Sequence, residues 1–599
     1  MTADGSVPKR SDIEEKYKWD LTELYENAEE WEREFKECEA MLPDISGFRG
    51  TLTESNENIA QCIRFEDRLS RKLEKVFTWA HLKHDEDLSN TTFQSLHDRA
   101  FNLAVRMETE SSYIVPEILT LDRDGLADLM KDPKLEFARE TIRSMIRQKD
   151  HYLSEKEEKL LSLADEALDA SSKTFKMLND ADLSFPTIKD EEGNDIELSH
   201  GRFVGLLLSR DRDLRKRALE NYYASYHSHR NTFASTLEGE LKRRSFKAKA
   251  RNYPSSLHAS LDNDEVDPSL YNGLIEAVHH SFPDLHSYVK LRKEALGVDE
   301  LHMYDVYTPL VKDFERKVRW EDAKELVLEA IEPLGEEYRN IVREGLSSGW
   351  VDVYESRKKR SGAYSSGCYD SPPYILMNYD GNIKELFTLA HEMGHSIHSY
   401  LSNKNQPHIT ADYRIFVAEV ASTVNEVLLL DHLRRKWRSK EEQAYLVNHY
   451  LESFKGTVFR QTMFAEFERD ITAMVEKNIP ITADSLGAHY GKMNREYFGE
   501  DMIIDREIEL EWARIPHFYY NFYVYKYATS FSVANAIALR ILRGDTDQLD
   551  RYLDLLKAGS SRPPMDLLKD AGMDLSTPTP IKEALKVFSG LVDEMGALL

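Results

Sequence analysis

Apolar residues recur at intervals of three and four along most of the chain, a spacing that places them on one face of an α-helix. Residues 31–41 and 153–170 are clear examples of this pattern. Leu, Ala, Glu, Lys and Arg, which favour helices, are abundant, whereas proline and glycine number only 19 and 26 in 599 residues. The pattern therefore predicts a mainly α-helical fold.

Three short segments depart from the helical pattern and predict β structure. In residues 184–198, apolar residues alternate around an Asp-Glu-Glu-Gly-Asn turn, which is typical of a β-hairpin. The other two segments are residues 301–311 and 373–379. The last lies just upstream of the motif described below, so we expect a small β element beside that motif.

The length of the chain indicates more than one lobe, because single hydrophobic cores stop growing at about 250–300 residues. Residues 1–199 are dominated by amphipathic helices and carry no chemical motif, so we expect an N-terminal helical lobe there. We expect residues 200–599 to form the domain that carries the chemistry, since the motifs below all lie in it.

Acidic residues outnumber basic ones, 106 against 79, which gives a formal net charge of −27. Such a surface repels polyanions. The densest basic stretch, residues 242–251, is predicted to be helical, and its lysines and arginines fall on several faces, which favours a solvated helix over a nucleic-acid patch. We therefore expect no nucleic-acid partner.

The three cysteines, Cys38, Cys62 and Cys368, are widely spaced and odd in number, which indicates free thiols in a reducing compartment. The first residues lack the apolar core of a signal peptide, and no stretch is long and apolar enough to span a bilayer. These features predict a cytoplasmic protein without membrane contact.

Residues 384–402 read KELFTLAHEMGHSIHSYLS, a predicted helix that carries His391, Glu392 and His395 as an HExxH motif. Residues four apart share a helix face, so both imidazoles can reach one metal ion, and Glu392 lies where it can activate a water. Gly394 costs roughly 1 kcal/mol in a helix interior. Its presence predicts the close approach of another backbone or of a substrate.

A catalytic zinc needs a third protein ligand and an open position. His398 is one candidate, but it lies about 10 Å along the helix axis from His391. We therefore expect His398 to contact either one of the residues that bind the metal or the substrate. Glu419 is the preferred third ligand, because an unpaired carboxylate among its apolar neighbours would be costly. Glu426, seven residues further on, is either a hydrogen-bond partner of a ligand imidazole or a surface carboxylate.

Residues 516–527, PHFYYNFYVYKY, concentrate polar aromatic groups that could stabilise the negative oxygen formed during hydrolysis. Tyr520 and Tyr527 are seven residues apart and would share a helix face, and His517 lies three residues before Tyr520. An aromatic core stripe is the alternative interpretation of this segment. Many phenol hydroxyls in one segment favour a hydrated cleft.

Several stretches of this sequence together resemble the oligoendopeptidase F branch of the thimet oligopeptidase family. The resemblance extends over nearly the whole chain. The matching stretches, in order, are YKWDLTELY at 17–25, TLAHEMGHSIHSYLS, FVAEVASTVNE, PHFYYNFYVYKYATS, and LDLLKAGSSRPPMDLLKDAGMDL at 553–575.

The resemblance implies a two-lobed helical fold around a deep channel, with one zinc ion at its floor, that hydrolyses internal bonds of short peptides. It implies Glu392 as the catalytic base and His517, Tyr520 and Tyr527 as groups that act on the transition state. The choice among Tyr520, Tyr523 and Tyr527 stays open. The ligands that it implies for the metal are His391, His395 and Glu419.

Two other functions stay open at this stage. One is a peptidase that trims only termini, a carboxypeptidase or dipeptidyl carboxypeptidase of related fold. The other is a peptide-binding protein without catalytic activity, although the intact Glu392 argues against it. The oligomeric state and the cleavage preference are not predicted by the sequence.

Overall fold

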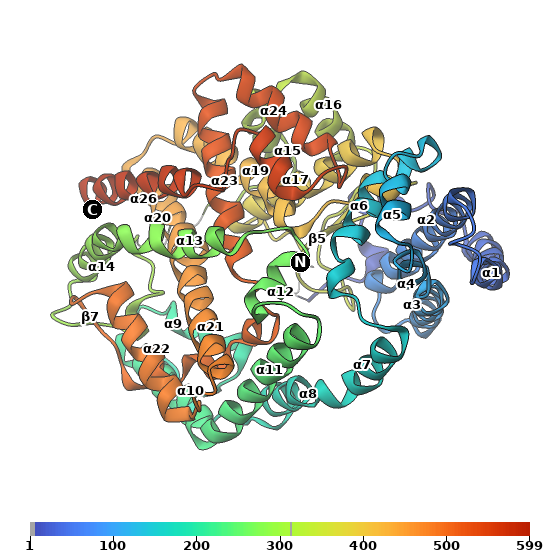
Figure 1. Cartoon of the computed structure of the whole chain (residues 1–599). Coiled ribbons are helices and arrows are strands. Elements are labelled where there is room, and N and C mark those ends of the chain that lie inside the picture. Colours follow the sequence, from blue (N-terminus) through green and yellow to red (C-terminus); the bar gives the residue numbers. More distant parts are fainter. Residues whose placement is uncertain (1–5, 312–313, 315) are drawn as a thin grey trace. The chain divides into compact units, whose positions relative to one another are not determined.

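The computed structural model describes residues 6–311, 314 and 316–599 (Figure 1). It is mainly α-helical, which confirms the predicted fold class. The domain boundary predicted at residue 199 and the substrate channel stay predictions. The chain forms two compact units of three segments each: unit 1 comprises Met1–Tyr152, Glu315–Leu433 and Ile537–Met573, and unit 2 comprises Leu153–Phe314, Arg434–Ala536 and Asp574–Leu599.

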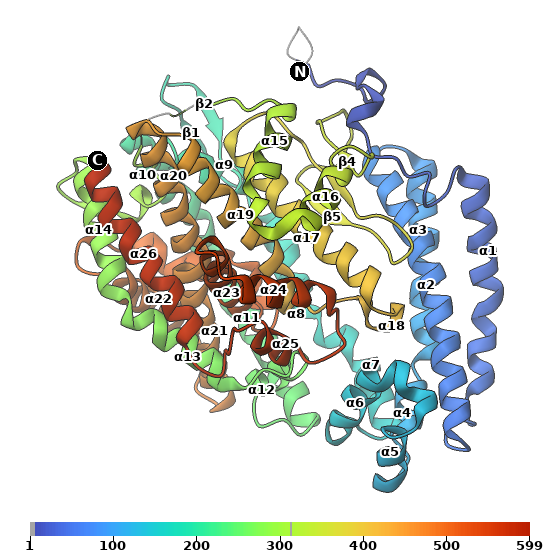
Figure 2. The same cartoon turned by 90° about the horizontal axis from the view of Figure 1, so that it is seen from above.

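Unit 1 begins with three long helices that lie side by side, α1 (Ala28–Ile45), α2 (Asn56–Glu86) and α3 (Thr91–Ser111) (Figure 2). α1 contains the helix predicted at 31–41. The core of this three-helix bundle is aromatic. The rings of Trp31 and Trp79 stack with centroids 6.2 Å apart, and the Trp31 indole donates to a backbone carbonyl of α2. Burying such large side chains is the main stabilising contribution to this bundle.

A small sheet in unit 1 precedes the motif helix, as the β signal at 373–379 predicts. Its strands are β4 (Val351–Asp352), β5 (Tyr364–Ser366) and β6 (Tyr374–Leu376), in the order β4-β6-β5. β6 pairs parallel with β4 and antiparallel with β5. β5 is therefore an edge strand.

The remaining helices of unit 1 follow this sheet or connect the bundle to it. α19 begins in unit 1 and its last residues belong to unit 2. The helices are α4 (Ile114–Ile118), α5 (Arg123–Leu129), α6 (Arg139–Arg147), α15 (Trp320–Ala330), α16 (Gly335–Gly345), α17 (Ile383–Asn405), α18 (His408–Ala411), α19 (Ile415–Lys436), α24 (Thr546–Lys557) and α25 (Pro564–Asp570).

Unit 2 is also helical. α23 begins in unit 2 and ends in unit 1. The helices are α7 (Glu155–Leu168), α8 (Ala170–Met177), α9 (His200–Leu207), α10 (Arg212–Ser228), α11 (Arg230–Ala250), α12 (Ser256–Asp262), α13 (Pro268–His280), α14 (Phe282–Leu296), α20 (Lys440–Phe454), α21 (Arg460–Glu476), α22 (Ala483–Phe498), α23 (Tyr525–Leu542) and α26 (Thr579–Leu598).

Two of the segment predictions in unit 2 have different outcomes. The hairpin is confirmed: β1 (Thr187–Lys189) pairs antiparallel with β2 (Asp195–Glu197). The β prediction for 301–311 is wrong beyond its first two residues. β3 (Leu301–His302) pairs with β7 (Met502–Ile503), and then a 3-10 turn begins, because the buried Asp305 carboxylate accepts from the His302 backbone and from Arg215.

The basic stretch at 242–251 forms the end of α11 and its C-cap residue, so it is helical as predicted, but it is not simply solvated. Arg244 is buried and pairs with Glu240 and Glu468. Lys247 and Arg251 pair with carboxylates of α7. These basic groups therefore stabilise unit 2.

Two further findings concern the surface and the thiols. None of the helices in the described part of the chain has a long enough apolar stretch to cross a bilayer. Cys38, Cys62 and Cys368 are free thiols, as the sequence predicts, and the structure shows that all three are buried. Burial raises the pKa of each thiol, to about 12 for Cys38 and about 11 for the other two.

Candidate metal centre

The HExxH motif lies in the middle of α17, whose beginning is set by its own sequence. Gly381 adopts a φ of +86°, which reverses the chain after β6. The Asn382 side chain then caps the helix by accepting from the Glu385 backbone N–H at 2.8 Å. The cap and the turn fix where the helix starts, and thereby which face of α17 carries the two histidines.

Gly394 lets α19 approach α17 closely, which confirms the prediction from its place in the helix. A Cβ atom at this position would lie 2.6 Å from the Cα of Ser422 and 2.7 Å from the carbonyl oxygen of Ala421. The buried Asn425 joins the same two helices, donating to the Ala390 carbonyl at 3.2 Å. α19 is therefore held against the motif at backbone contact distance.

This contact brings His391, His395 and Glu419 together. The Nε2 atoms of the two histidines are 3.2 Å apart, and Oε2 of Glu419 lies 3.5 Å from the first and 3.6 Å from the second. Ligands about 2.0–2.1 Å from a tetrahedral ion are roughly 3.3–3.4 Å from one another. The three atoms thus have the spacing of three corners of a metal-binding tetrahedron.

Each of these three side chains also has a hydrogen-bond partner outside the cluster. Nδ1 of His391 lies 2.5 Å from Oε1 of Glu426, so Glu426 is a hydrogen-bond partner of the imidazole and not a surface carboxylate. The His395 ring hydrogen-bonds the backbone of Ala418. The Ser422 hydroxyl donates to Oε2 of Glu419 at 3.0 Å. Such partners fix the tautomer and orientation of metal ligands.

The electrostatics of the site favour a cation. Burial opposes charge on the His391 imidazole, but the hydrogen bond and negative charge of Glu426 raise the pKa of His391 to about 9. Burial and the neighbouring His391 lower the pKa of His395 to about 4. The carboxylates therefore favour positive charge beside the two imidazoles, and a donor set of two imidazoles and one carboxylate fits a divalent cation.

Glu392 lies beside this cluster without belonging to it. It is buried, with 8% of its surface exposed, and burial raises the pKa of its carboxyl group. The backbone of Ser365 on β5 hydrogen-bonds the carboxylate, and the Ser365 hydroxyl lies 2.8 Å from that of Ser396 on α17. The edge strand therefore holds Glu392 in place.

β5 is itself anchored to α2. The Tyr364 hydroxyl donates to Oδ2 of the fully buried Asp85 at 2.8 Å, and Arg360 pairs with the same carboxylate at 3.3 Å. Since Tyr364 precedes Ser365, this anchor determines the position of the backbone that holds Glu392. Neither Asp85 nor Ser365 can be identified from the sequence, because nothing in the local pattern links them to the motif.

His398 is not brought into the metal cluster. Its side chain is 1% exposed, and its ring stacks on Tyr413 with centroids 3.6 Å apart. Among the described residues neither ring nitrogen has a hydrogen-bond partner, and burial lowers the pKa of the imidazole to about 3. Among the described residues the ring therefore hydrogen-bonds no candidate metal ligand, and a contact of His398 with the substrate stays a prediction.

The polar aromatic segment lies in unit 2 and is not one helix, which corrects the prediction of a shared helix face. A 3-10 turn ends at Tyr519, and α23 begins only at Tyr525. Between them Asn521 and Phe522 adopt φ values of +53° and +57°, which a helix does not permit.

The polar rings of this segment still gather around His517. The His517 ring lies edge-on to the rings of Tyr520 and Tyr527, with centroid distances of 5.5 and 6.2 Å. The ring centroids of Tyr523 and Tyr527 are 5.2 Å apart. Tyr520 is 49% exposed, whereas Tyr519 and Tyr525 are buried. The segment thus divides into core tyrosines and an accessible group of His517, Tyr520, Tyr523 and Tyr527.

Buried charges hold this non-helical turn in place. Arg244 donates to the Phe518 carbonyl at 2.6 Å, and Glu468 accepts from the Phe522 backbone N–H at 2.8 Å. Arg244 and Glu468 also pair with each other at 2.5 Å. An arginine that is far away in the sequence therefore overrides the local helical pattern.

Comparison with known proteins agrees with these motifs. A family model described as peptidase family M3 matches residues 206–587, and a model described as oligopeptidase F matches residues 117–185. The chain is 44% identical to oligopeptidase PepF of Bacillus subtilis over 99% of this chain and 89% of that protein. It is 38% identical to the group B oligopeptidase PepB of Streptococcus agalactiae over 98% of each.

Solved structures show the same fold. Oligoendopeptidase F from Enterococcus faecium is 40% identical, with a TM-score of 0.75 over 95% of this chain and 99% of that one. A protein of Chlamydophila abortus is 36% identical, with a TM-score of 0.94 over 99% of this chain and 100% of the other.

Proposed function

This chain belongs to peptidase family M3, and on that basis we propose that it is a zinc-dependent oligoendopeptidase whose metal is held by His391, His395 and Glu419. The observation that carries the assignment is the triangle of ligand atoms, with sides of 3.2, 3.5 and 3.6 Å. Two imidazoles and one carboxylate form a donor set typical of catalytic zinc. When bound, zinc supplies a Lewis acid that polarises the peptide carbonyl and lowers the pKa of water.

Glu392 is the general base in this proposal. Its carboxylate takes the proton of the attacking water and passes it to the nitrogen of the departing amine. The hydrogen bond from the backbone of Ser365 and the packing of the helix restrict its rotation, so that the group is already oriented when the peptide binds.

We assign His517, Tyr520 and Tyr527 to the stabilisation of the negative oxygen that forms at the attacked carbonyl. Their mutual ring contacts and the exposure of Tyr520 support a role toward a ligand over one in the core. Imidazole and phenol groups donate hydrogen bonds to such an oxygen and are worth most in a site that excludes water.

The substrates in this proposal are peptides of limited length, cut at internal bonds. The matched relatives carry the names oligopeptidase and oligoendopeptidase, which supports this class. We also propose that the N-terminal lobe spans residues 1–199 and the catalytic domain residues 200–599. The free thiols support a cytoplasmic location.

The proposal is tested by mapping cleavage products of a peptide mixture by mass spectrometry, with and without a chelator, together with elemental analysis for zinc. The parent protein should carry one zinc per chain and cut internal bonds, and the chelator should abolish the cuts. Glu392→Gln should keep its zinc and lose a factor of about 10²–10⁴ in turnover, because only the base is removed.

Glu419→Ala is the matched variant that separates the two roles. It should lose zinc, since only two protein ligands remain. Activity retained in Glu392→Gln, or equal zinc in Glu419→Ala and parent, would contradict the assigned roles. Cuts confined to the chain ends would show a peptidase that trims termini.

A further inference from the structure

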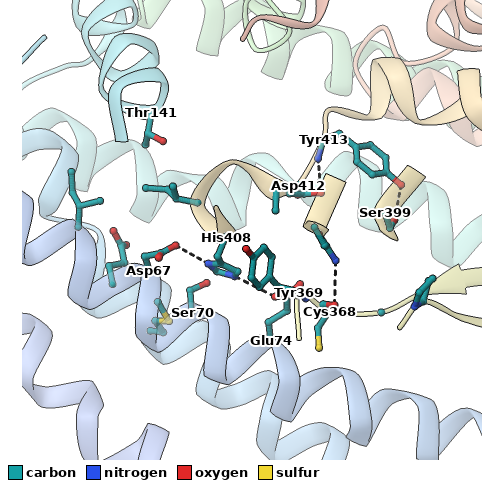
Figure 3. Close-up of a pocket in the computed structure, with 18 of the residues that line it drawn as sticks. Asp67, Ser70, Glu74, Thr141, Cys368, Tyr369, Ser399, His408, Asp412 and Tyr413 are labelled. Atoms are coloured by element: carbon teal, nitrogen blue, oxygen red, sulfur yellow. Dashed lines mark hydrogen bonds and ion pairs between the residues drawn. The ribbon is translucent and has the colours of Figure 1, made fainter. Parts of the chain in front are cut away.

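Unit 1 contains a cavity of about 540 Å³ that the chemistry above does not use (Figure 3). Its walls come from α2, α3 and α6 on one side and from the segments 367–373 and 399–413 on the other. Pockets of roughly 300–1,000 Å³ with a few polar groups are the usual size for binding small ligands or parts of larger ones. The cavity is therefore large enough for one or two side chains of a peptide.

One part of the cavity is acidic. His408 bridges Asp67 and Glu74, with Nδ1 2.7 Å from the first carboxylate and Nε2 3.3 Å from the second (Figure 3). Glu66 and Asp412 also line the cavity. Among the described residues neither has an ion-pair partner, but Ser111 hydrogen-bonds Glu66, and the backbone N–H of Tyr413 donates to Oδ1 of Asp412 at 2.9 Å. No lysine or arginine is among the described lining residues, and His408, whose pKa the two carboxylates raise to about 9, supplies one positive charge against the four carboxyl groups Glu66, Asp67, Glu74 and Asp412.

The pKa values of Glu66 and Asp412 are both raised. Burial raises the pKa of Glu66, and the charge of Asp67 raises it further. Partial desolvation of the carboxyl group and the nearby Glu74 raise the pKa of Asp412, although the residue is exposed overall and Arg414, His408 and the Tyr413 backbone N–H favour its charge. A positively charged group in the cavity would offset these shifts, because an opposite charge within about 4–6 Å favours the ionised carboxylate.

The spacing of the acidic groups argues against a metal ion. The group of described residues whose ligand atoms come within 4.8 Å of one another is His391, His395 and Glu419, and the cavity carboxylates form no such group. Ile63, Met107 and Tyr369 supply apolar and aromatic wall. Separated carboxylates with apolar walls suit an organic cation on a hydrocarbon stem.

The cavity shares helix α17 with the metal centre. Ser399 and Asn403 line it and follow His395 on α17 by four and eight residues, which is about 6 and 12 Å along the helix. Gly367, the residue after β5, lines it as well. An extended peptide advances about 3.3 Å per residue. A group bound in the cavity would therefore lie about two to four residues from the cleaved bond.

We propose that this cavity is a substrate subsite that binds a positively charged group of the peptide, its α-amino group or a Lys or Arg side chain, about two to four residues from the cleaved bond. The proposal rests on the proposed peptidase function. It gives the enzyme a preference for cationic peptides that the metal centre itself does not supply.

The test uses quenched fluorescent peptides that share one cleavage site and carry Lys, Gln or Glu at each position two to four residues away, with free or acetylated N-termini. The parent should cleave the best Lys peptide about tenfold faster in kcat/KM than its Gln counterpart, as expected for one charged contact. If the α-amino group is the bound cation, acetylation should produce the loss instead.

The double variant Glu66→Gln/Asp412→Asn should reduce this preference to within about twofold while leaving kcat/KM for the acetylated Gln peptide, which carries neither cation, unchanged. The control is Asp128→Asn, which removes an exposed carboxylate of unit 1 outside the cavity. A preference that survives the double variant, or a parent that shows none, would overturn the proposal.

Binding separates this proposal from the peptidase function. In the Glu392→Gln background, fluorescence anisotropy should show about tenfold tighter binding of the preferred cationic peptide. Adding the two cavity substitutions should remove the difference. A cationic preference in binding without cleavage by the parent would contradict the peptidase function alone, whereas equal binding of all peptides would contradict the subsite.

Discussion

A Cβ atom on Gly394 would lie 2.6 Å from the Cα of Ser422, closer than side chains and backbones approach in folded proteins. The absence of a side chain at this one position lets α19 bring Glu419 to within 3.6 Å of both motif histidines. Helix α17 supplies the imidazoles by its own periodicity, but the third candidate ligand depends on this contact.

Gly394→Ala should therefore impair metal binding as well as stability. The added methyl group forces the two helices apart, and overpacking of this kind costs about 1–3 kcal/mol of unfolding free energy. Zinc affinity, measured by competition with a chelating dye, should fall together with the melting temperature. The control is Gly273→Ala on α13, where nothing lies within 4 Å of the new Cβ and helix propensity should raise stability slightly.

Glu426→Gln should weaken zinc binding by about 10–100-fold, since partners that orient a ligand imidazole typically contribute that much. The amide keeps the size of the side chain but removes the negative charge opposite Nδ1 of His391. Isothermal titration of the metal-free protein with zinc measures the loss. An affinity equal to that of the parent would show that Glu426 does not orient the ligand.

Tyr364→Phe should lower kcat by a few fold to about tenfold without loss of zinc, because it frees β5, whose next residue holds Glu392. Tyr25→Phe is the matched control, since it also removes a hydrogen bond from a buried tyrosine to a carboxylate, here Glu34. Both variants should lose similar stability, and only the first should lose kcat. Equal kcat in the two variants would contradict the anchoring role.

His408→Gln should show a pH-dependent loss of stability. Burial opposes the imidazolium, but Asp67 and Glu74 raise the pKa of His408 to about 9, above the value near 6.5 of an unfolded histidine. The charged pair therefore contributes its full stability below about pH 6.5, and this contribution is lost as the pH rises through 9. Urea unfolding at pH 6, 8 and 10 should show the gap between parent and variant closing.

The same substitution at His432, which pairs with Glu329 across a more exposed surface, is the control for this series. Exposed ion pairs contribute little, so His432→Gln should have a small effect at each pH. A gap for His408→Gln that stays constant from pH 6 to 10 would show that the His408 contacts stabilise the fold without its charge.

The local sequence by itself determined the helical fold class, the HExxH helix, and the facing of His391 and His395. These follow from a repeat of 3.6 residues per turn, which acts within one element. Gly394 also predicted a close backbone contact. Glycine in a helix interior lowers the stability of the helix, and a close contact that needs the missing side chain explains its presence.

Only the tertiary structure decided which groups surround the motif. It showed that Glu426 faces His391, that His398 stacks on Tyr413, and that Ser365 reaches Glu392 from an edge strand. The turn after Tyr519 is set by Arg244 and Glu468 against the local helical pattern. These outcomes depend on the energies of contacts between residues far apart in the chain. The periodicity within a single element contains no information about those energies.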